Sequence, residues 1–215
     1  MFGNFSLIDT ICMIPGMLIG FTFHEYAHAK VADMLGDKTP RFQGRLTLNP
    51  VVHIDLIGFV LMIFAKIGWA KPVETNPRAF KNYYKDDLKV TLAGPLANLA
   101  VAVIFSLILG VFYRFGGEIE SASLYTIVNT MFYYTIYLNV MMFIFNLLPL
   151  PSFDGGSVIR DLFPNFYYKY YNRYYEYRYI IVAIILLTPI IRIIRIPIER
   201  LTNILLMLAL KIGMF

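Results

Sequence analysis

The sequence predicts an all-α polytopic membrane protein with a small membrane-associated β-hairpin region, a three-span core and a broken C-terminal helical region. Of its 215 residues, 58% are hydrophobic and only 15% are charged, against about 25% charged residues in soluble domains. Three apolar runs reach the roughly 20 residues that a helix needs to cross a bilayer. The other apolar stretches are too short, or too often interrupted by proline and arginine, for a simple crossing.

The three spans differ in how they end. The first ends at Gly36 and carries charge only near its start and in its last third. The third is closed by Pro149 and Pro151, because proline cannot continue the helical hydrogen-bond pattern. The expected spans are residues 5–35, 88–113 and 122–148.

The C-terminal region, residues 179–215, is apolar but contains Pro189 and Pro197 together with three arginines. Because these prolines fall inside the apolar run, we expect two short helical segments there.

The stretch between the first and second spans is neither a plain loop nor a full span. Residues 41–49 alternate loosely between apolar and polar side chains, as a strand would. Residues 54–67 are too short to cross comfortably, and residues 69–75 fit a second strand. The pattern predicts a hairpin dipping into the membrane interface, beside protein or a wet cavity that satisfies its backbone.

Basic residues orient the chain, because lysine and arginine gather on the cytoplasmic side of membrane proteins. Residues 36–87 contain eight of them and residues 149–178 contain four, whereas the gap between the second and third spans has only Arg114 beside Glu118 and Glu120. We therefore expect the N-terminus outside the cell. The net charge of +5 is explained by these loops, and nucleic acid is not an expected partner.

Two further features limit the possible functions. The single Cys12 excludes an intramolecular disulfide framework and a zinc site built mainly of cysteines. Residues 1–9 lack the basic start of a secretory signal, so we expect the first span to remain in the mature protein. The tyrosine-rich residues 167–179 are expected in the aromatic belt at the cytoplasmic interface.

The cytoplasmic end of the first span contains His24-Glu25-Tyr26-Ala27-His28, an HExxH pattern. Side chains four residues apart lie on one helix face, so two imidazoles can hold one zinc ion while Glu25 reaches a water molecule that the ion acidifies. The alternative is that both histidines only pack in the bundle. Ionisable residues inside membrane segments are costly, which favours the functional interpretation.

A catalytic zinc site has three protein ligands and one open position. The best third candidate is Asp154, just beyond the prolines that end the third span and followed by two glycines that allow close backbone approach. Taken alone, Asp154 is better explained by an ordinary Asp-Gly turn just past a helix. Its pairing with HExxH makes it a candidate ligand.

Several ordered motifs make the chain resemble the site-2 protease family of intramembrane zinc metalloproteases, peptidase family M50. The resemblance covers most of residues 15–160. The motifs are FHEYAHA at 23–29, LNP at 48–50, HID at 53–55, GWAKPV at 68–73, AGPLAN at 93–98 and NLLPLPSFDG at 146–155.

This resemblance implies roles for individual residues. It implies that His24, His28 and Asp154 bind Zn²⁺, that Glu25 is the general base and that Asn146 stabilises the developing oxyanion. An amide N–H is a suitable oxyanion donor, although an asparagine at a helix end is more often a cap. Residues 1–160 would then form the catalytic membrane core, and residues 161–215 an interfacial tyrosine-rich loop with C-terminal helices.

The sequence allows more than one role for two polar residues, His53 and Asn98. His53 could compete as the third metal ligand, but Asp55 is a possible local partner and the family supplies an aspartate, so we favour a supporting or structural role. Asn98, within the second span, is a candidate for a hydrogen bond across helices near the site.

The expected function is hydrolysis of a peptide bond within transmembrane helices of substrate proteins, near the cytoplasmic face. The partners would be the bilayer and single-span or other transmembrane substrates, and the location a bacterial or archaeal cell membrane. Many family members carry a PDZ or CBS domain, and no gap or tail here has room for one. The alternatives are an inactive homologue acting as a binding or regulatory protein, and a metal transporter. The sequence does not specify the substrate or the oligomeric state.

Overall fold

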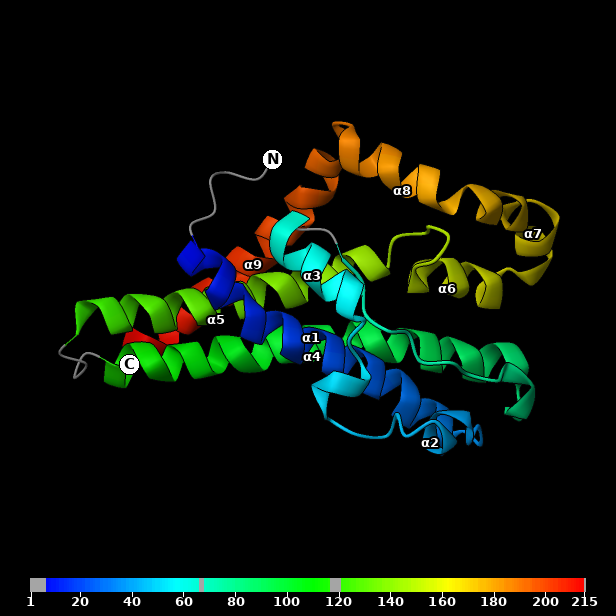
Figure 1. Cartoon of the computed structure of the whole chain (residues 1–215), viewed down its shortest axis with the longest axis horizontal. Helices are drawn as coiled ribbons and strands as arrows, with labels where there is room; N and C mark the ends of the chain where they lie inside the picture. Colours follow the sequence, from blue (N-terminus) through cyan, green and yellow to red (C-terminus); the bar gives the residue numbers. More distant parts are fainter. Residues whose placement is uncertain (1–6, 66–67, 117–120, 215) are drawn as a thin grey trace.

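The computed structural model describes residues 7–65, 68–116 and 121–214, in which long helices lie side by side along the longest axis (Figure 1). The ends of three expected segments, at residues 5–6, 66–67 and 215, lie outside the described residues, as do Glu118 and Glu120.

Three helices confirm the three predicted spans. Each is long and apolar enough to cross a membrane. Ser121 caps the third of them, since its side chain accepts a hydrogen bond from the Leu124 backbone N–H at 3.3 Å. This helix ends before Pro149, as expected for a segment closed by proline. The three helices are α1 (Leu7–Met34), α4 (Tyr83–Phe115) and α5 (Ala122–Asn146).

Short helices connect these spans. The helices α2, α6 and α7 lie at the end of the bundle away from the C-terminus (Figure 1). The short elements are α2 (Thr39–Phe42), η1 (Pro50–Val52), α3 (Leu56–Ala65), η2 (Pro77–Ala79), α6 (Asp154–Leu162), α7 (Pro164–Lys169) and η4 (Tyr171–Tyr177).

The β-hairpin prediction is wrong, because no strand occurs among the residues that the structure describes. Pro40 and Pro50 lie at the starts of α2 and η1, where their fixed φ favours a helical turn over the expected strand in residues 41–49. Residues 69–75 form no helix, and among the described residues their strand-like pairing is limited to an isolated antiparallel bridge between Ile54 and Ala70.

The C-terminal region forms one short helix, α8 (Arg178–Leu187), and one long helix, α9 (Ile190–Met214). The chain bends by 76° between these two segments, so the pair adds at most one broken span to the other three. Pro189 lies at the bend as expected, whereas Pro197 lies inside α9 and does not break it. The expectation of two short segments is therefore correct only for α8.

Helix α9 packs against α4 and α5 and completes the main apolar core. The Ser106 hydroxyl donates a hydrogen bond to the Leu205 carbonyl oxygen at 2.5 Å, which ties α4 to α9. The buried members of this core are Ala102, Leu109, Ile136, Val140, Ile198, Leu205 and Ala209.

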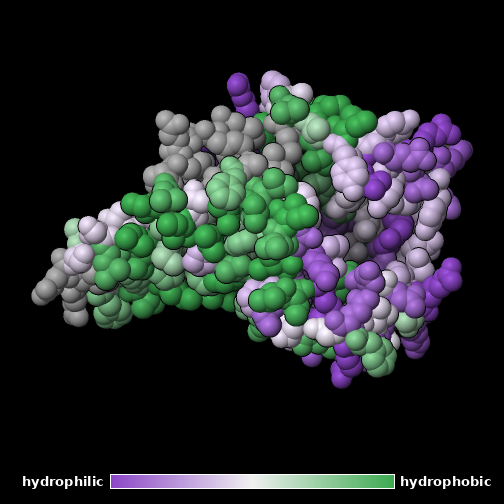
Figure 2. All heavy atoms as spheres, viewed as in Figure 1, coloured by the Kyte–Doolittle hydropathy of each residue, from purple (hydrophilic) through white to green (hydrophobic). Residues whose placement is uncertain are grey.

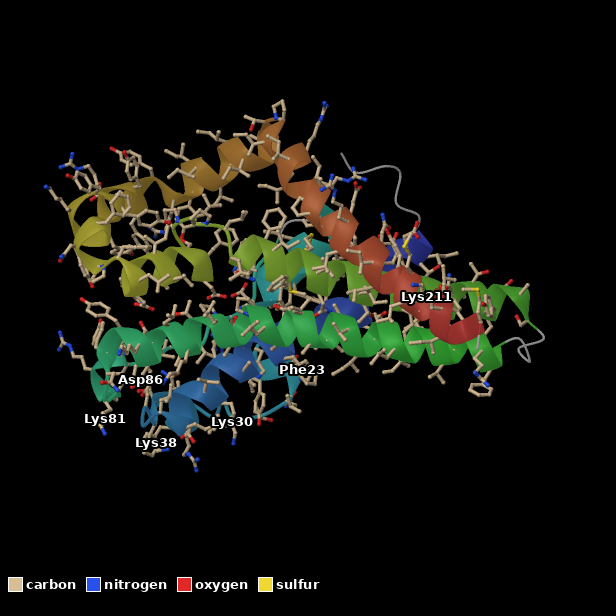
Figure 3. All side chains as sticks on the ribbon, turned by 180° about the vertical axis from the view of Figure 1, so that it is seen from behind. Phe23, Lys30, Lys38, Lys81, Asp86 and Lys211 are labelled. Atoms are coloured by element: carbon tan, nitrogen blue, oxygen red, sulfur yellow. The ribbon has the colours of Figure 1, made fainter. Side chains whose placement is uncertain are left out.

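The molecular surface divides into two parts. Apolar residues cover the long part of the bundle, and hydrophilic residues gather at the end that holds α2, α6 and α7 (Figure 2). Lys30, Lys38 and Lys81 lie at this hydrophilic end, whereas Lys211 lies far from it on α9 (Figure 3). Apolar surface of this extent indicates contact with lipid, which supports a multi-pass membrane protein.

Candidate metal centre

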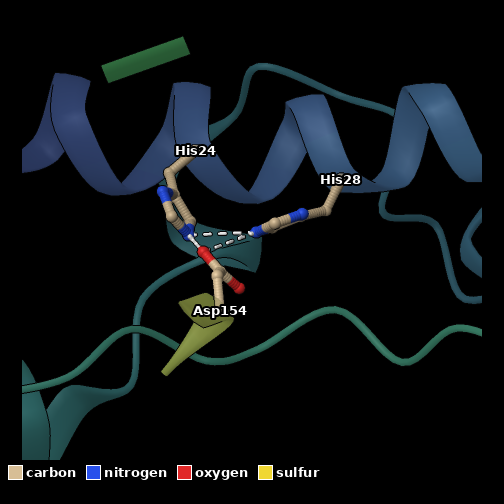
Figure 4. Close-up of side chains that lie close together, drawn as sticks. All are labelled: His24, His28 and Asp154. Carbon is tan, nitrogen blue, oxygen red and sulfur yellow. Dashed lines mark hydrogen bonds and ion pairs between the residues drawn. The ribbon is translucent and has the colours of Figure 1, made fainter. Parts of the chain in front are cut away.

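His24 and His28 on α1 and Asp154 at the start of α6 meet at one point (Figure 4). The two histidine Nε2 atoms are 3.0 Å apart. The Asp154 Oδ2 atom is 3.3 Å from Nε2 of His24 and 3.5 Å from Nε2 of His28. The structure thus brings together the three residues that the sequence suggests as metal ligands.

The chain reaches Asp154 through a tight turn after α5. Ser152 has a positive φ of 76° in this turn. A Cβ atom at Gly155 would lie 2.1 Å from the Leu148 carbonyl oxygen, so α6 can approach the end of α5 only with glycine there.

An ion-pair cluster also holds α6 against α4. The Arg160 guanidinium on α6 bonds to the buried Asp87 on α4 and to Asp161, the latter at 2.9 Å. Burial raises the pKa of Asp161, and Arg160 opposes that effect. This cluster fixes the helix that carries Asp154 relative to the bundle.

Hydrogen bonds fix the orientation of both imidazoles. Nδ1 of His24 lies 2.7 Å from the Asn98 side-chain oxygen, and Nδ1 of His28 lies 2.7 Å from the Val90 carbonyl oxygen. Because both partners are acceptors, each Nδ1 carries the proton and each Nε2 presents a lone pair towards Asp154. This is the arrangement in which histidine binds a metal through Nε2.

The donor atoms fit Zn²⁺. The Asp154 Oδ2 atom is buried without a hydrogen-bond partner among the described residues, and it faces two nitrogen lone pairs. Three converging acceptors need a cation, and atoms bound tetrahedrally to zinc at 2.0–2.2 Å lie roughly 3.3–3.5 Å apart.

Glu25 lies beside this centre and is almost fully buried. Its Oε2 atom accepts a hydrogen bond from the Val73 backbone N–H at 2.8 Å. Val73 belongs to residues 69–75, so this segment passes beside the carboxylate predicted to be the general base.

Asn146, the predicted oxyanion donor, is the last residue of α5. Its side-chain nitrogen donates one hydrogen bond to the Met142 carbonyl oxygen at 3.0 Å. An asparagine amide has two N–H groups, so one remains for another acceptor.

His53 is not part of the three-residue cluster. It is fully buried, and its Nε2 atom bonds to the Thr47 carbonyl oxygen at 2.7 Å. Burial lowers the pKa of His53, which favours the neutral ring. The suggested partner Asp55 instead accepts a hydrogen bond from the Gly58 backbone N–H at 2.8 Å, at the start of α3.

A cavity of about 410 Å³ borders Asp154 and extends towards η4. The cavity provides space for water or a peptide next to the metal centre. Its other lining residues include Ser157, Arg160, Tyr167, Tyr171 and Tyr175.

The sequence suggested that Asn98 makes a hydrogen bond across helices near the site, and the structure confirms it. The structure shows a fully buried side chain that holds His24 and is itself held, since its nitrogen donates to the Gly20 carbonyl oxygen and to the Asn139 side-chain oxygen, each at 3.0 Å. The presence of a polar residue inside an apolar span indicated such a bond. Nothing in the sequence indicated that the Val90 carbonyl oxygen would bond to His28.

Replacing Asn98 with Ala should weaken zinc binding by about 10- to 100-fold, because His24 would lose the partner that fixes its proton and ring orientation. Zinc affinity is measured by competition with a chromophoric chelator. Asn129→Ala is the matched control. Asn129 lies on α5, and its side-chain oxygen accepts a hydrogen bond from the Tyr113 hydroxyl on α4 rather than from a residue of the centre. Equal affinities of wild type and Asn98→Ala would contradict the role assigned to this contact.

Gly94 has a role at the centre that the sequence did not indicate. A Cβ atom there would lie 2.3 Å from Nε2 of His28 and 2.7 Å from Cε1 of His24, so only glycine lets α4 pass both imidazoles.

Gly94→Ala should therefore displace both rings and remove most of the bound zinc, as measured by metal analysis of purified protein. Gly110→Ala is the control on the same helix, since its Cβ atom would meet Ile212 at 2.7 Å, in the contact between α4 and α9. Full zinc occupancy in Gly94→Ala would show that the rings do not need this space.

The fold and the centre define a multi-pass membrane protein with a zinc site. The chain belongs to peptidase family M50, whose family-wide sequence profile matches residues 12–189.

Three relatives carry the printed name "Putative zinc metalloprotease". YwhC of Bacillus subtilis is 39% identical over 83% of this chain and 81% of its own length. MJ0611 of Methanocaldococcus jannaschii is 27% identical over 73% of each chain. Rip2 of Mycolicibacterium smegmatis is 28% identical over 83% of this chain and 68% of its own length.

No solved structure gives a significant match. The family and the relatives identify the chain as a metalloprotease that uses Zn²⁺. They favour this function over a metal transporter or an inactive homologue.

Proposed function

We propose that this metalloprotease is an intramembrane endopeptidase of the site-2 type, which hydrolyses a peptide bond within transmembrane helices of substrate proteins. The observation that carries the proposal is the position of both imidazoles on α1, a helix able to span the membrane. A metal centre built on such a helix is reached most directly by a substrate that is itself in the membrane.

The proposed active site faces the cytoplasm of a bacterial or archaeal cell. Asp154 belongs to α6, at the hydrophilic end of the molecule (Figure 2). Lys30, Lys38 and Lys81 lie at this end (Figure 3), and the stretches 36–87 and 149–178 contain twelve lysines and arginines in the sequence. Positive charge at one end of a membrane protein supports a cytoplasmic location for that end.

In the proposed reaction His24, His28 and Asp154 hold the ion. Zn²⁺, when bound, supplies Lewis acidity that activates water and polarises the scissile carbonyl. Glu25 accepts a proton from the attacking water and then transfers it to the leaving amine. The remaining Asn146 N–H stabilises the developing oxyanion.

A helical substrate hides its carbonyls in its own hydrogen bonds, so it must unwind before hydrolysis. Residues 69–75 belong to no helix, and Val73 within them bonds to Glu25, which supports binding of the unwound substrate by strand addition to this segment. The proposed partners are therefore single-span or other transmembrane proteins within the bilayer.

The test uses zinc-loaded, detergent-solubilised protein and a panel of single-span substrates. The products are mapped by mass spectrometry. Cleavage inside the transmembrane segments supports the proposal, and cleavage confined to their soluble flanks overturns the intramembrane assignment. Wild type is compared with Glu25→Gln to exclude a contaminating protease.

A further inference from the structure

Arg45 is a buried arginine to which no role has been assigned above. It is 5% exposed, which is unusual for arginine. Its guanidinium donates hydrogen bonds to the carbonyl oxygens of Val52 and Lys71. Within the part of the chain that the structure describes, Arg45 forms no ion pair at contact distance, so its buried hydrogen bonds go to backbone.

These bonds clamp two backbone segments together. The Lys71 N–H donates to the His53 carbonyl oxygen at 3.0 Å, next to the bridge between Ile54 and Ala70. Lys71 is therefore held on both sides, through its N–H by residue 53 and through its carbonyl by Arg45.

The clamp is two residues from Glu25's partner. Pro72 follows Lys71 and has a fixed φ, which limits how the chain can turn before Val73. The Val73 N–H then donates to Oε2 of Glu25 at 2.8 Å. The position of this N–H is thus determined by the carbonyl that Arg45 holds.

Arg45 and Glu25 also attract each other electrostatically. Burial lowers the pKa of Arg45, while the carboxylates of Glu25 and Glu74 oppose that effect by favouring the charged guanidinium. Arg45 therefore places positive charge near a carboxylate that is itself almost fully buried.

We propose that Arg45 is a positioning residue for hydrolysis, which fixes residues 71–73 so that the Val73 N–H orients the Glu25 carboxylate for proton transfer. This inference rests on the proposed function, in which Glu25 is the general base. A misplacement of about 1 Å at a reacting group can cost roughly 100-fold in rate. Arg45 would therefore affect kcat without contacting the metal or the substrate.

The test compares full-length Arg45→Met with wild type in detergent. We expect kcat to fall about 100-fold, while zinc content stays equal to wild type and KM changes much less than kcat. Hydrogen–deuterium exchange of residues 69–76 should become faster. Arg41→Met is the matched control. Arg41 lies four residues before Arg45, is half-exposed and bonds to Asp33, so its replacement should leave both readouts unchanged.

If Arg45→Met does not fold, Arg45→Lys serves as the test variant. Lysine retains the charge but lacks the planar fork that bonds two carbonyls, so we expect a smaller fall in kcat, again with zinc retained. Unchanged kcat in a folded Arg45 variant, or a loss of activity that follows a loss of zinc, overturns the inference. A wild type that cleaves no substrate overturns the proposed function instead, and the exchange measurement then still tests the clamp.

Discussion

Replacing Glu25 with Gln should abolish proteolysis and leave zinc bound. Glutamine has nearly the same size, and its side-chain oxygen can still accept the Val73 N–H, but it cannot take a proton from water at neutral pH. General-base catalysis contributes about 10²- to 10⁴-fold, so kcat should fall by that factor. The measurement is cleavage of a single-span substrate alongside metal analysis of the same sample.

Glu199→Gln is the control for this change. Glu199 lies on α9, is about half exposed and pairs with Arg195 on the same helix, so its replacement should leave turnover unchanged. Wild-type turnover in Glu25→Gln would refute its assignment as general base. Loss of zinc from Glu25→Gln would show that the residue supports the centre instead.

Asp154→Ala should remove zinc and activity together. The Asp154 carboxylate supplies the one negative charge in the cluster, and without it two neutral imidazoles remain to hold the ion. Because the loss of an outer partner costs about 10- to 100-fold in metal affinity, the loss of a ligand should exceed that range. Isothermal titration of the apoprotein with zinc measures the change.

Asp55→Asn is the matched control, since Asp55 accepts a hydrogen bond from the Gly58 N–H at the start of α3 and asparagine caps a helix equally well. It should bind zinc as wild type does. Asp154→Ala with wild-type zinc affinity would mean that another residue completes the site, and His53 would then be the first to test.

The spans could be predicted because lipid imposes a simple condition on length and polarity. The breaks in the helices and the structure between the spans were harder to predict. Pro189 bends the chain, whereas Pro197 is accommodated within α9 because neighbouring helices can satisfy the backbone that proline frees. The hairpin prediction failed because loose alternation in residues 41–49 was weaker than the local preference of Pro40 and Pro50 for helical turns.

The candidate ligands were accessible from sequence because His24 and His28 are close in the chain, and their spacing alone places them on one helix face. The groups that orient them were not. The Val90 carbonyl and Gly94 matter only because α4 crosses α1 at one particular register, and that register depends on packing along both helices. The contact between Glu25 and Val73 spans 48 residues and likewise has no local signal.

The most direct test is anomalous diffraction at the zinc edge from crystals of the wild-type protein. The account predicts a peak about 2.0–2.2 Å from Nε2 of His24, Nε2 of His28 and the Asp154 carboxylate. A peak bound to His53, or a zinc-loaded protein in which Asp154 is not a ligand, would contradict it.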